Sequence, residues 1–184
     1  DTETETEPTV WIDKVSVLTE SVVDVPGLNK TEKAEKDQMH YFLMEVKDES
    51  SAEATDIAEL EAALADSRIK TINVAGEIAA DKTLTVSRAV TVIGAEGASV
   101  TFDNTDGFEI VDAGEVTFEN IDIKVENNEE GWQGIYGIQA YGASKAVFKD
   151  ISVTGADAGI LVNGAEAALE GVVDVSGNEF GGIE

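Results

Sequence analysis

Acidic side chains gather in one short stretch near the middle of the chain. Asp103, Asp106 and Asp112 fall within ten consecutive residues, with turn-forming residues between them. Ca²⁺ is a hard cation that binds carboxylate and carbonyl oxygens, so these three aspartates are the predicted metal ligands. The chain has no cysteine and a single histidine, His40, which excludes a thiolate site and offers no imidazole cluster. No cofactor other than Ca²⁺ is indicated.

The same stretch contains Asn104-Thr105-Asp106-Gly107, which has two interpretations. Paired carboxylates act as acid and base in the hydrolysis of glycosidic bonds, and Asp106 offers one member of such a pair. Asn, Asp and Gly are also the ordinary residues of a tight turn. Because the motif supplies only one carboxylate of the pair, we favour the turn and keep the hydrolase as an alternative.

A second candidate site combines aromatic, amide and acidic groups in one irregular segment. Relative to the spacing elsewhere, residues 126–133 form an insertion of about eight residues, and insertions in a regular scaffold commonly carry binding groups. Aromatic faces beside amides and carboxylates suit sugar rings, which present C–H faces and hydroxyl edges. Alternatively, Trp132 folds over the core and shields it, since tryptophan is often partly buried for packing alone. The candidate ligand-binding residues are Glu129, Glu130, Trp132, Gln133, Tyr136 and Tyr141.

These groups lie among repeats that predict the architecture. In each repeat, an apolar and a charged residue precede Asn120, Asp150 or Gly171, and an alternating β-branched run follows. Asn, Asp and Gly enter a left-handed backbone conformation most readily, so each marks a corner between two short strands. The spacings of about 30 and about 21 residues are typical of solenoids. The repeats occupy residues 116–123, 147–153 and 169–175.

Short strands with a period of two fill the rest of this part of the chain. Like positions recur at one-coil spacing, which favours parallel stacking over a sandwich of hairpins. Within a coil, Phe118, Ile121 and Ile123 are expected to point inward, and Glu119 and Asp122 to face solvent. The other predicted strands are 71–74, 83–86, 89–93, 98–102, 107–111, 135–140 and 159–162.

A helix is predicted over residues 56–66, before the first complete coil. Asp56 can cap the helix, and Glu59 can complete a capping box. An apolar stripe at helical spacing would face the core. The stripe consists of Ile57, Leu60, Ala63 and Leu64.

The chain before this helix has a different composition. Residues 1–8 are charged and of low complexity, which predicts a flexible acidic tether. Residues 9–50 form a predicted strand-containing arm, with strands over 10–18 and 40–46. Within the arm, residues 29–38 are charged and lack an apolar face, so we expect a solvated loop or short helix there. Residues 55–184 form the solenoid domain.

The segment from Asp56 to Glu184 resembles the right-handed parallel β-helix proteins of the pectate-lyase-like superfamily. In that superfamily an amphipathic helix commonly closes the first coil, and residues 56–64 followed by 70–78 look like this entry. The stretches 83–86 and 90–94 look like its next strands. The resemblance implies a mainly β fold, a right-handed parallel β-helix with an N-terminal capping helix, to which the β-rich arm is added. A non-catalytic bacterial member fits best.

Two enzyme groups on this fold offer motifs for comparison. Asn104-Thr105-Asp106 looks like the Asn-Thr-Asp of polygalacturonases, but those enzymes also carry Gly-His-Gly, which this chain lacks, and Arg-Ile-Lys. Here Arg68-Ile69-Lys70 precedes the first coil, in the wrong order. Pectate lyases need an arginine base, and neither Arg68 nor Arg88 lies in the later coils. The candidate lysine bases, Lys124, Lys145 and Lys149, have no neighbour that would depress their pKa. Enzymatic activity is therefore left open, with the balance against it.

The formal net charge of −26 limits the partners. Such a charge repels nucleic acid phosphates and anionic lipid headgroups, and no apolar run is long enough to span a membrane. We expect an extracellular or cell-surface bacterial protein. Residues 180–184 stop within a coil, so we expect further coils or another domain to cover that end. The predicted function is adhesion to a polysaccharide or cell-surface ligand; the alternatives are a lyase or hydrolase of polyanionic sugars and a structural stalk.

Overall fold

The computed structural model describes residues 28–36, 39–46, 50–128 and 130–184. The chain divides into two compact units, Asp1–Lys47 and Asp48–Glu184. The predicted tether 1–8, the predicted strand 10–18 and Glu129 lie outside the described residues. Each unit is considered by itself below.

Within the described residues of the first unit, β1 (Leu28–Lys36) and β2 (Met39–Val46) form an antiparallel pair. The strand predicted over 40–46 is confirmed by β2. The loop or short helix predicted for 29–38 is wrong, because β1 occupies most of that stretch. Its register runs from Leu28 opposite Val46 to Lys36 opposite Met39. Pairing with β2 supplies the backbone hydrogen bonds of β1, and a charged sequence without alternation gives no sign of such a partner.

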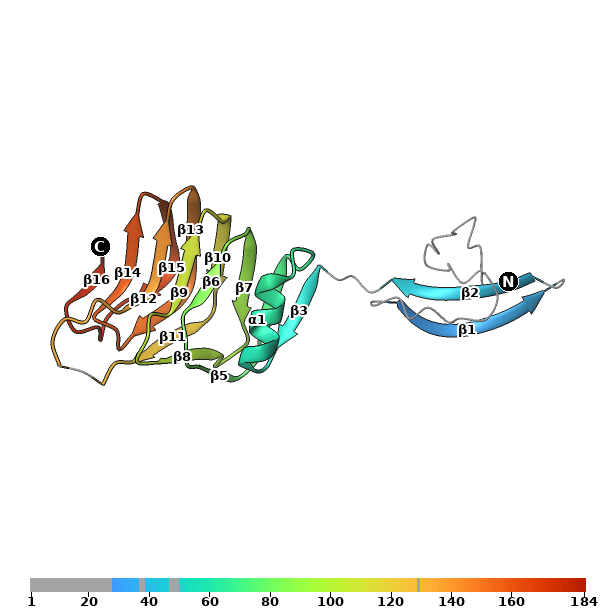
Figure 1. Ribbon diagram of the computed structural model, residues 1–184, viewed down its shortest axis with the longest axis horizontal. Helices are drawn as coiled ribbons and strands as arrows, with labels where there is room; N and C mark the ends of the chain where they lie inside the picture. The colour runs from blue at the N-terminus through green and yellow to red at the C-terminus, as the bar shows by residue number, and fades with distance from the viewer. Residues whose placement is uncertain (1–27, 37–38, 47–49, 129) are drawn as a thin grey trace. The chain divides into compact units, whose positions relative to one another are not determined.

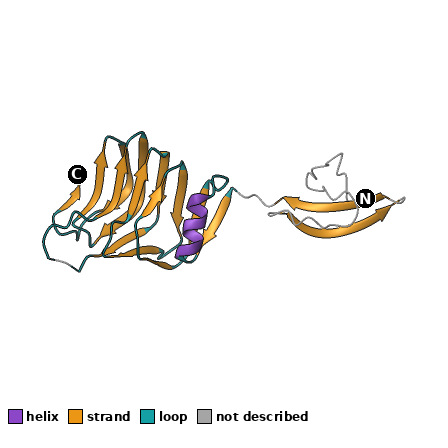
Figure 2. Ribbon diagram, in the orientation of Figure 1, coloured by secondary structure: helices purple, strands orange, loops and turns teal. Residues whose placement is uncertain are grey.

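The second unit is a parallel β-helix of about six turns, which confirms the predicted fold class (Figures 1 and 2). Each turn places short strands on three faces, and every neighbouring pair within a face is parallel. The first face consists of β3 (Ser51–Ala54), β4 (Thr71–Val74), β7 (Val90–Gly94), β10 (Gly114–Glu119) and the first parts of β13 (Ser144–Thr154) and β15 (Glu166–Asp174).

The other two faces complete each turn. The second face consists of β5 (Glu77–Ala80), β8 (Ser99–Asp103), β11 (Asp122–Glu126) and the later parts of β13 and β15. The third face consists of β6 (Leu84–Val86), β9 (Phe108–Val111), β12 (Tyr136–Tyr141), β14 (Ala158–Asn163) and β16 (Gly181–Ile183). The long strands β13 and β15 therefore bend around a corner rather than stopping at it.

The core is a stack of like positions from successive turns. Phe118 lies in register with Val92 on one side and Phe148 on the other, and the rings of Phe118 and Phe148 are stacked with centroids 6.3 Å apart. Phe118, Ile121 and Ile123 are buried as predicted, while Glu119 and Asp122 are partly exposed. Because period-two alternation continues through each turn, the apolar side chains fill the interior and the acidic ones coat the surface.

The corner between the first and second faces has the predicted left-handed conformation. Asn120 has φ 52°, Asp150 φ 51° and Gly171 φ 63°. Asp150 Oδ1 accepts a hydrogen bond of 2.9 Å from the amide of Val172 in the next turn. A Cβ on Gly171 would lie 2.1 Å from that same oxygen. Glycine is therefore required there because the aspartate of the preceding turn occupies the space of a side chain.

The N-terminal end of the β-helix is closed by α1 (Ile57–Ala65), within the predicted range 56–66 (Figure 1). Asp56 caps it by accepting from the amide of Glu59, as predicted. The Glu59 carboxylate accepts from the amide and the hydroxyl of Thr55. In a standard capping box it would accept from the amide of the N-cap residue, one position later. At the other end of the helix, the guanidinium of Arg88 donates at 3.2 Å to the carbonyl oxygen of Ala89 and also to three carbonyl oxygens of α1 and the turn after it. These belong to Ala63 (2.6 Å), Leu64 (2.8 Å) and Ile69 (2.5 Å).

Candidate functional site: an aromatic cluster on the longest loop

The segment between β11 and β12 leaves the regular path of the β-helix and is fixed by one buried carboxylate. Asp157 has no exposed surface. Its Oδ2 accepts from the amides of Gln133 (2.6 Å) and Ile135 (3.0 Å), and its Oδ1 accepts from the side-chain amide of Asn127 (2.7 Å). Both ends of the segment are therefore attached to the following turn, which gives the insertion a defined position.

Three aromatic side chains meet on this segment. The ring of Trp132 packs edge-on against Tyr136, with centroids 5.7 Å apart, and against Phe180, with centroids 5.5 Å apart. Trp132 remains 48% exposed and Phe180 52% exposed. Edge-to-face packing of this kind holds aromatic rings without covering them. We call Trp132, Tyr136 and Phe180 the aromatic cluster.

Polar groups border the aromatic cluster. The hydroxyl of Tyr136 donates to Glu184 Oε2 at 3.0 Å. Burial raises the pKa of Tyr136 above its ordinary value, and the bond to Glu184 raises that pKa further. Glu130 and Gln133, on the same segment as Trp132, are exposed. Exposed aromatic surface therefore lies beside a tyrosine–carboxylate hydrogen bond, while ligand binding by this segment stays a prediction.

Tyr141 is separated from the aromatic cluster. It lies at the far end of β12 from Tyr136, about 17 Å along the strand at the usual rise per residue. Its hydroxyl donates to Gln139 Oε1. Burial raises the pKa of Tyr141, and the nearby carboxylates of Glu109 and Asp106 add to that rise. Of the sequence-predicted ligand residues, the structure brings the rings of Trp132 and Tyr136 into contact. The side-chain amide of Gln133 donates to the backbone carbonyl of Glu130 at 3.4 Å. Glu129 lies outside the described residues.

The three aspartates predicted to bind Ca²⁺ have different surroundings. Asp106 precedes β9 and accepts from the amide of Tyr136 at 2.8 Å. Asp112 follows β9, has φ 46°, and accepts from the amide of Ala143 at 2.9 Å. Asp103 is exposed at the end of β8. Within the described residues, no group of three His, Cys, Asp or Glu side chains is arranged to hold a metal ion. Ca²⁺ binding by these aspartates stays a prediction.

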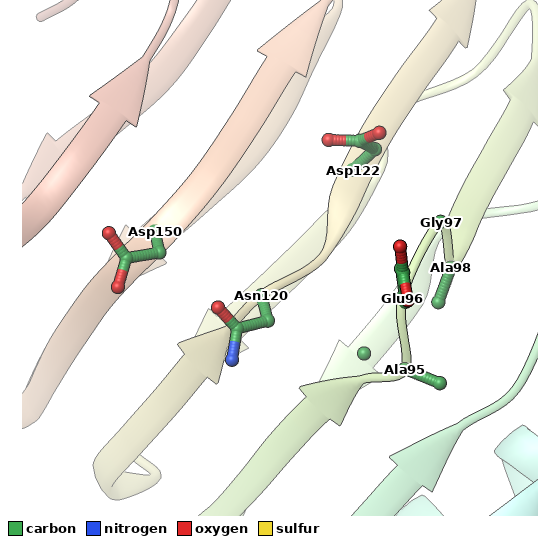
Figure 3. A pocket seen from close by; sticks show the side chains of 8 residues that line it. Ala95, Glu96, Gly97, Ala98, Asn120, Asp122 and Asp150 are labelled. Carbon is green, nitrogen blue, oxygen red and sulfur yellow. The ribbon is translucent and has the colours of Figure 1, made fainter.

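A second surface feature is a shallow polar pocket of about 450 Å³. It lies at the corner between the first and second faces, where Asn120 and Asp150 occupy the same place in successive turns (Figure 3). Glu96 and Asp122 contribute two further carboxylates. The pocket has no aromatic side chain in its lining, so it offers hydrogen-bond acceptors but no stacking surface.

Two residues that build the candidate site were not predicted from the sequence: Phe180 of the aromatic cluster, and Asp157, which fixes the loop of Trp132. Phe180 follows an ordinary turn sequence, and only the closure of the last turn brings it 5.5 Å from Trp132. Asp157 is a single aspartate between Ala156 and Ala158, and its role depends on contacts with residues 22 to 30 positions away. An aspartate inside an otherwise small and apolar stretch was the available signal.

Comparison with known proteins matches residues 51–162 to a family model described as a pectate lyase-like adhesive domain. This match covers more than half of the chain. The chain belongs to this family. The adhesive-domain match includes Trp132, Tyr136 and Asp157, whereas Phe180 lies after it. No curated protein and no solved structure matches the chain.

Membership of the adhesive-domain family confirms the resemblance drawn from the sequence and agrees with a role in adhesion. It also suggests a surface or extracellular location. None of the described helices is long and apolar enough to cross a membrane.

Proposed function

We propose that this domain is a bacterial extracellular or cell-surface adhesion module that binds carbohydrate through the aromatic cluster. The observation that carries the proposal is the pair of half-exposed rings, Trp132 and Phe180, held edge-on to each other. A contiguous patch of exposed apolar surface often marks a binding site. The buried Asp157 holds the loop of Trp132 in place, which limits the entropy lost when a ligand binds.

The chemistry of the cluster favours a neutral or partly cationic sugar over a strongly anionic one. Pyranose rings present C–H faces that pack on indole and phenyl rings, while their hydroxyls can donate to Glu130, Gln133 and Glu184. The same carboxylates, together with the net charge of −26, repel uronic acids and sulfated sugars. The module thus binds glycans by contact and hydrogen bonding.

Binding of the full chain to an array of neutral, amino and acidic polysaccharides tests this proposal. Trp132→Ala should weaken binding about tenfold, the equivalent of a lost aromatic contact, and Phe180→Ala should weaken it similarly. Trp132→Phe should retain most of the affinity. The matched control is Glu96→Gln, which alters an exposed residue of the polar pocket and should leave binding unchanged. Unaltered binding by Trp132→Ala, or a loss with Glu96→Gln alone, would place the ligand elsewhere.

The polar pocket is the observation that favours the alternative of a sugar lyase or hydrolase. Glu96, Asp122 and Asp150 line it together, and carboxylates that face one cavity can act as acid and base. Incubation of the chain with the same polysaccharides should yield fragments or unsaturated products under this alternative, and Asp122→Asn should abolish them. If the chain neither binds nor cleaves any of these glycans, the structural stalk is favoured.

A further inference from the structure

The outer side of the third face carries a further aromatic ring, at the opposite end of β12 from the aromatic cluster. Ile138 and Ala140 of β12 are fully buried, so Gln139 and Tyr141, which alternate with them, lie on the outer side of the sheet. Gln139 is nevertheless only 8% exposed. Its Oε1 accepts from the hydroxyl of Tyr141, so the Tyr141 ring lies back along β12 instead of standing away from it. Tyr141 stays partly exposed, as expected of a ring that rests on a sheet with one face toward solvent.

Two carboxylates lie within electrostatic range of this ring. Glu109 is in register with Gln139 and lies between two buried residues of β9, so it is on the same outer side. After burial, which is the larger cause, the charges of Glu109 and Asp106 raise the pKa of Tyr141. Asp106 also accepts from the backbone amide of Tyr136 at the start of β12. The ion pairs of the described residues include neither of these carboxylates, so both charges are available to a cation.

Strand β12 connects the Tyr141 ring to the aromatic cluster. It is paired on both sides, with β9 and β14, so this surface is the outer side of a continuous sheet and not an edge. Tyr136 and Tyr141 lie at its two ends, about 17 Å apart along the strand. A ligand that contacts both rings must therefore be extended. Aromatic rings and nearby carboxylates both attract ammonium groups, and a sugar with a free amino group adds a C–H face that packs on a ring.

We propose that the domain binds a linear glycan with free amino groups along the outer side of β12, with one sugar on the aromatic cluster and a later one on Tyr141. This proposal rests on the glycan binding proposed above and adds the direction, the minimum length and the charge of the ligand. Tyr141 supplies the second stacking surface, and Glu109 attracts the amino group. Because the second contact is intramolecular once the first has formed, the two together raise the affinity for a long chain over that for a short one.

Calorimetric titration of the full chain with linear glucosamine oligomers of two and of six sugars tests the proposal. The six-sugar oligomer should bind at least about tenfold more tightly than the two-sugar oligomer. Tyr141→Ala should weaken binding of the six-sugar oligomer about tenfold and leave the two-sugar oligomer, held by the aromatic cluster alone, unchanged. Trp132→Ala should weaken both. Glu109→Gln should weaken the six-sugar oligomer about threefold but not its N-acetylated counterpart, which has no charged amine.

The matched control is Glu77→Gln, which removes an exposed carboxylate of the second face and should change neither affinity. If Tyr141→Ala unfolds, Tyr141→Leu keeps an apolar side chain on the sheet and should still weaken binding of the six-sugar oligomer. Equal affinity of the unaltered chain for the two oligomers, or unchanged six-sugar binding by the Tyr141 variants, overturns the proposal.

The same titrations separate this proposal from the glycan binding on which it rests. If the Tyr141 variants bind normally while Trp132→Ala weakens both oligomers, the aromatic cluster stands as a glycan site and only the extension along β12 is wrong. A lysine hexamer that binds as tightly as the six-sugar oligomer, and that Tyr141→Ala weakens equally, also overturns the extension. In that case the surface would recognise a basic peptide instead of an amino sugar.

Discussion

The first turn and the last described turn of the β-helix cover the same stacked core to different degrees. At the first end α1 lies over the coil, with Leu60, Ala63 and Leu64 buried against it. In the last described turn Leu169 continues the stack of Phe118 and Phe148, yet it is 54% exposed while both phenylalanines are fully buried. An inward-pointing position in a solenoid thus contributes fully to stability only when a layer covers it on both sides.

The largest expected effect tests this difference along a single stack. Phe118→Ala should lower the free energy of unfolding by about 3–5 kcal/mol, because it empties a fully enclosed site. Leu169→Ala removes side-chain atoms that are half in water, so its cost should be about 1 kcal/mol. Urea unfolding followed by circular dichroism measures both values. Similar losses for the two variants would show that the last turn is covered as well as the middle ones.

The closure of the first end should depend on Arg88. Its guanidinium donates to the carbonyls of Ala63 and Leu64 at the C-terminal end of α1 and to that of Ile69 in the turn that follows. Arg88→Ala leaves these acceptors without that donor. We expect a loss of about 2 kcal/mol of stability and faster hydrogen exchange across α1. Arg68→Ala is the control, because the side chain of Arg68 is largely exposed. An unchanged exchange rate in α1 after Arg88→Ala would show that Arg88 does not stabilise the C-terminal end of the helix.

An effect of similar size but confined to one segment is expected at the loop that carries Trp132. Asp157→Asn keeps the shape of the side chain but replaces one acceptor oxygen with a donor, so either Asn127 or the amides of Gln133 and Ile135 lose a partner. One unsatisfied buried group costs about 1–3 kcal/mol. Hydrogen exchange of these two amides should accelerate, while the amide of Ala143, bound by Asp112 at another corner, stays protected. Equal protection in the variant and the parent would mean that other contacts fix the loop.

The sequence predicted what repeats from turn to turn. Left-handed corners at Asn120, Asp150 and Gly171 follow from residue type and spacing, and the buried Phe118 and Phe148 follow from the period of two. Because successive turns stack in parallel, the inward and corner positions of one turn recur at the same places in the next. These features depend on local sequence, which is why they could be predicted.

The parts that were not predicted depend on contacts between turns. Arg88 donates hydrogen bonds to carbonyls 19 and 25 residues away in the sequence. Asp157 accepts hydrogen bonds from backbone amides 22 and 24 residues away. Phe180 becomes part of the aromatic cluster only because the last turn closes beside Trp132. β1 was missed for a related reason, since its backbone partner β2 creates the strand. A single sequence carries no record of which distant groups meet.

The smallest expected effect concerns the turn that follows α1, at the closed end. Arg68 donates to Asp66 from both its side chain, with Nη2–Oδ2 at 2.7 Å, and its backbone, at 2.9 Å. These bonds lower the pKa of Asp66 to about 2 from its ordinary 3.8. Because the folded pKa is depressed, the stabilisation is complete above pH 3.8 and is lost as the pH falls toward 2. Carboxyl NMR titration should show this midpoint, and Arg68→Ala should raise it only part of the way, since the backbone amide remains. A midpoint near 3.8 in the unaltered chain would show that solvent screens this exposed pair completely.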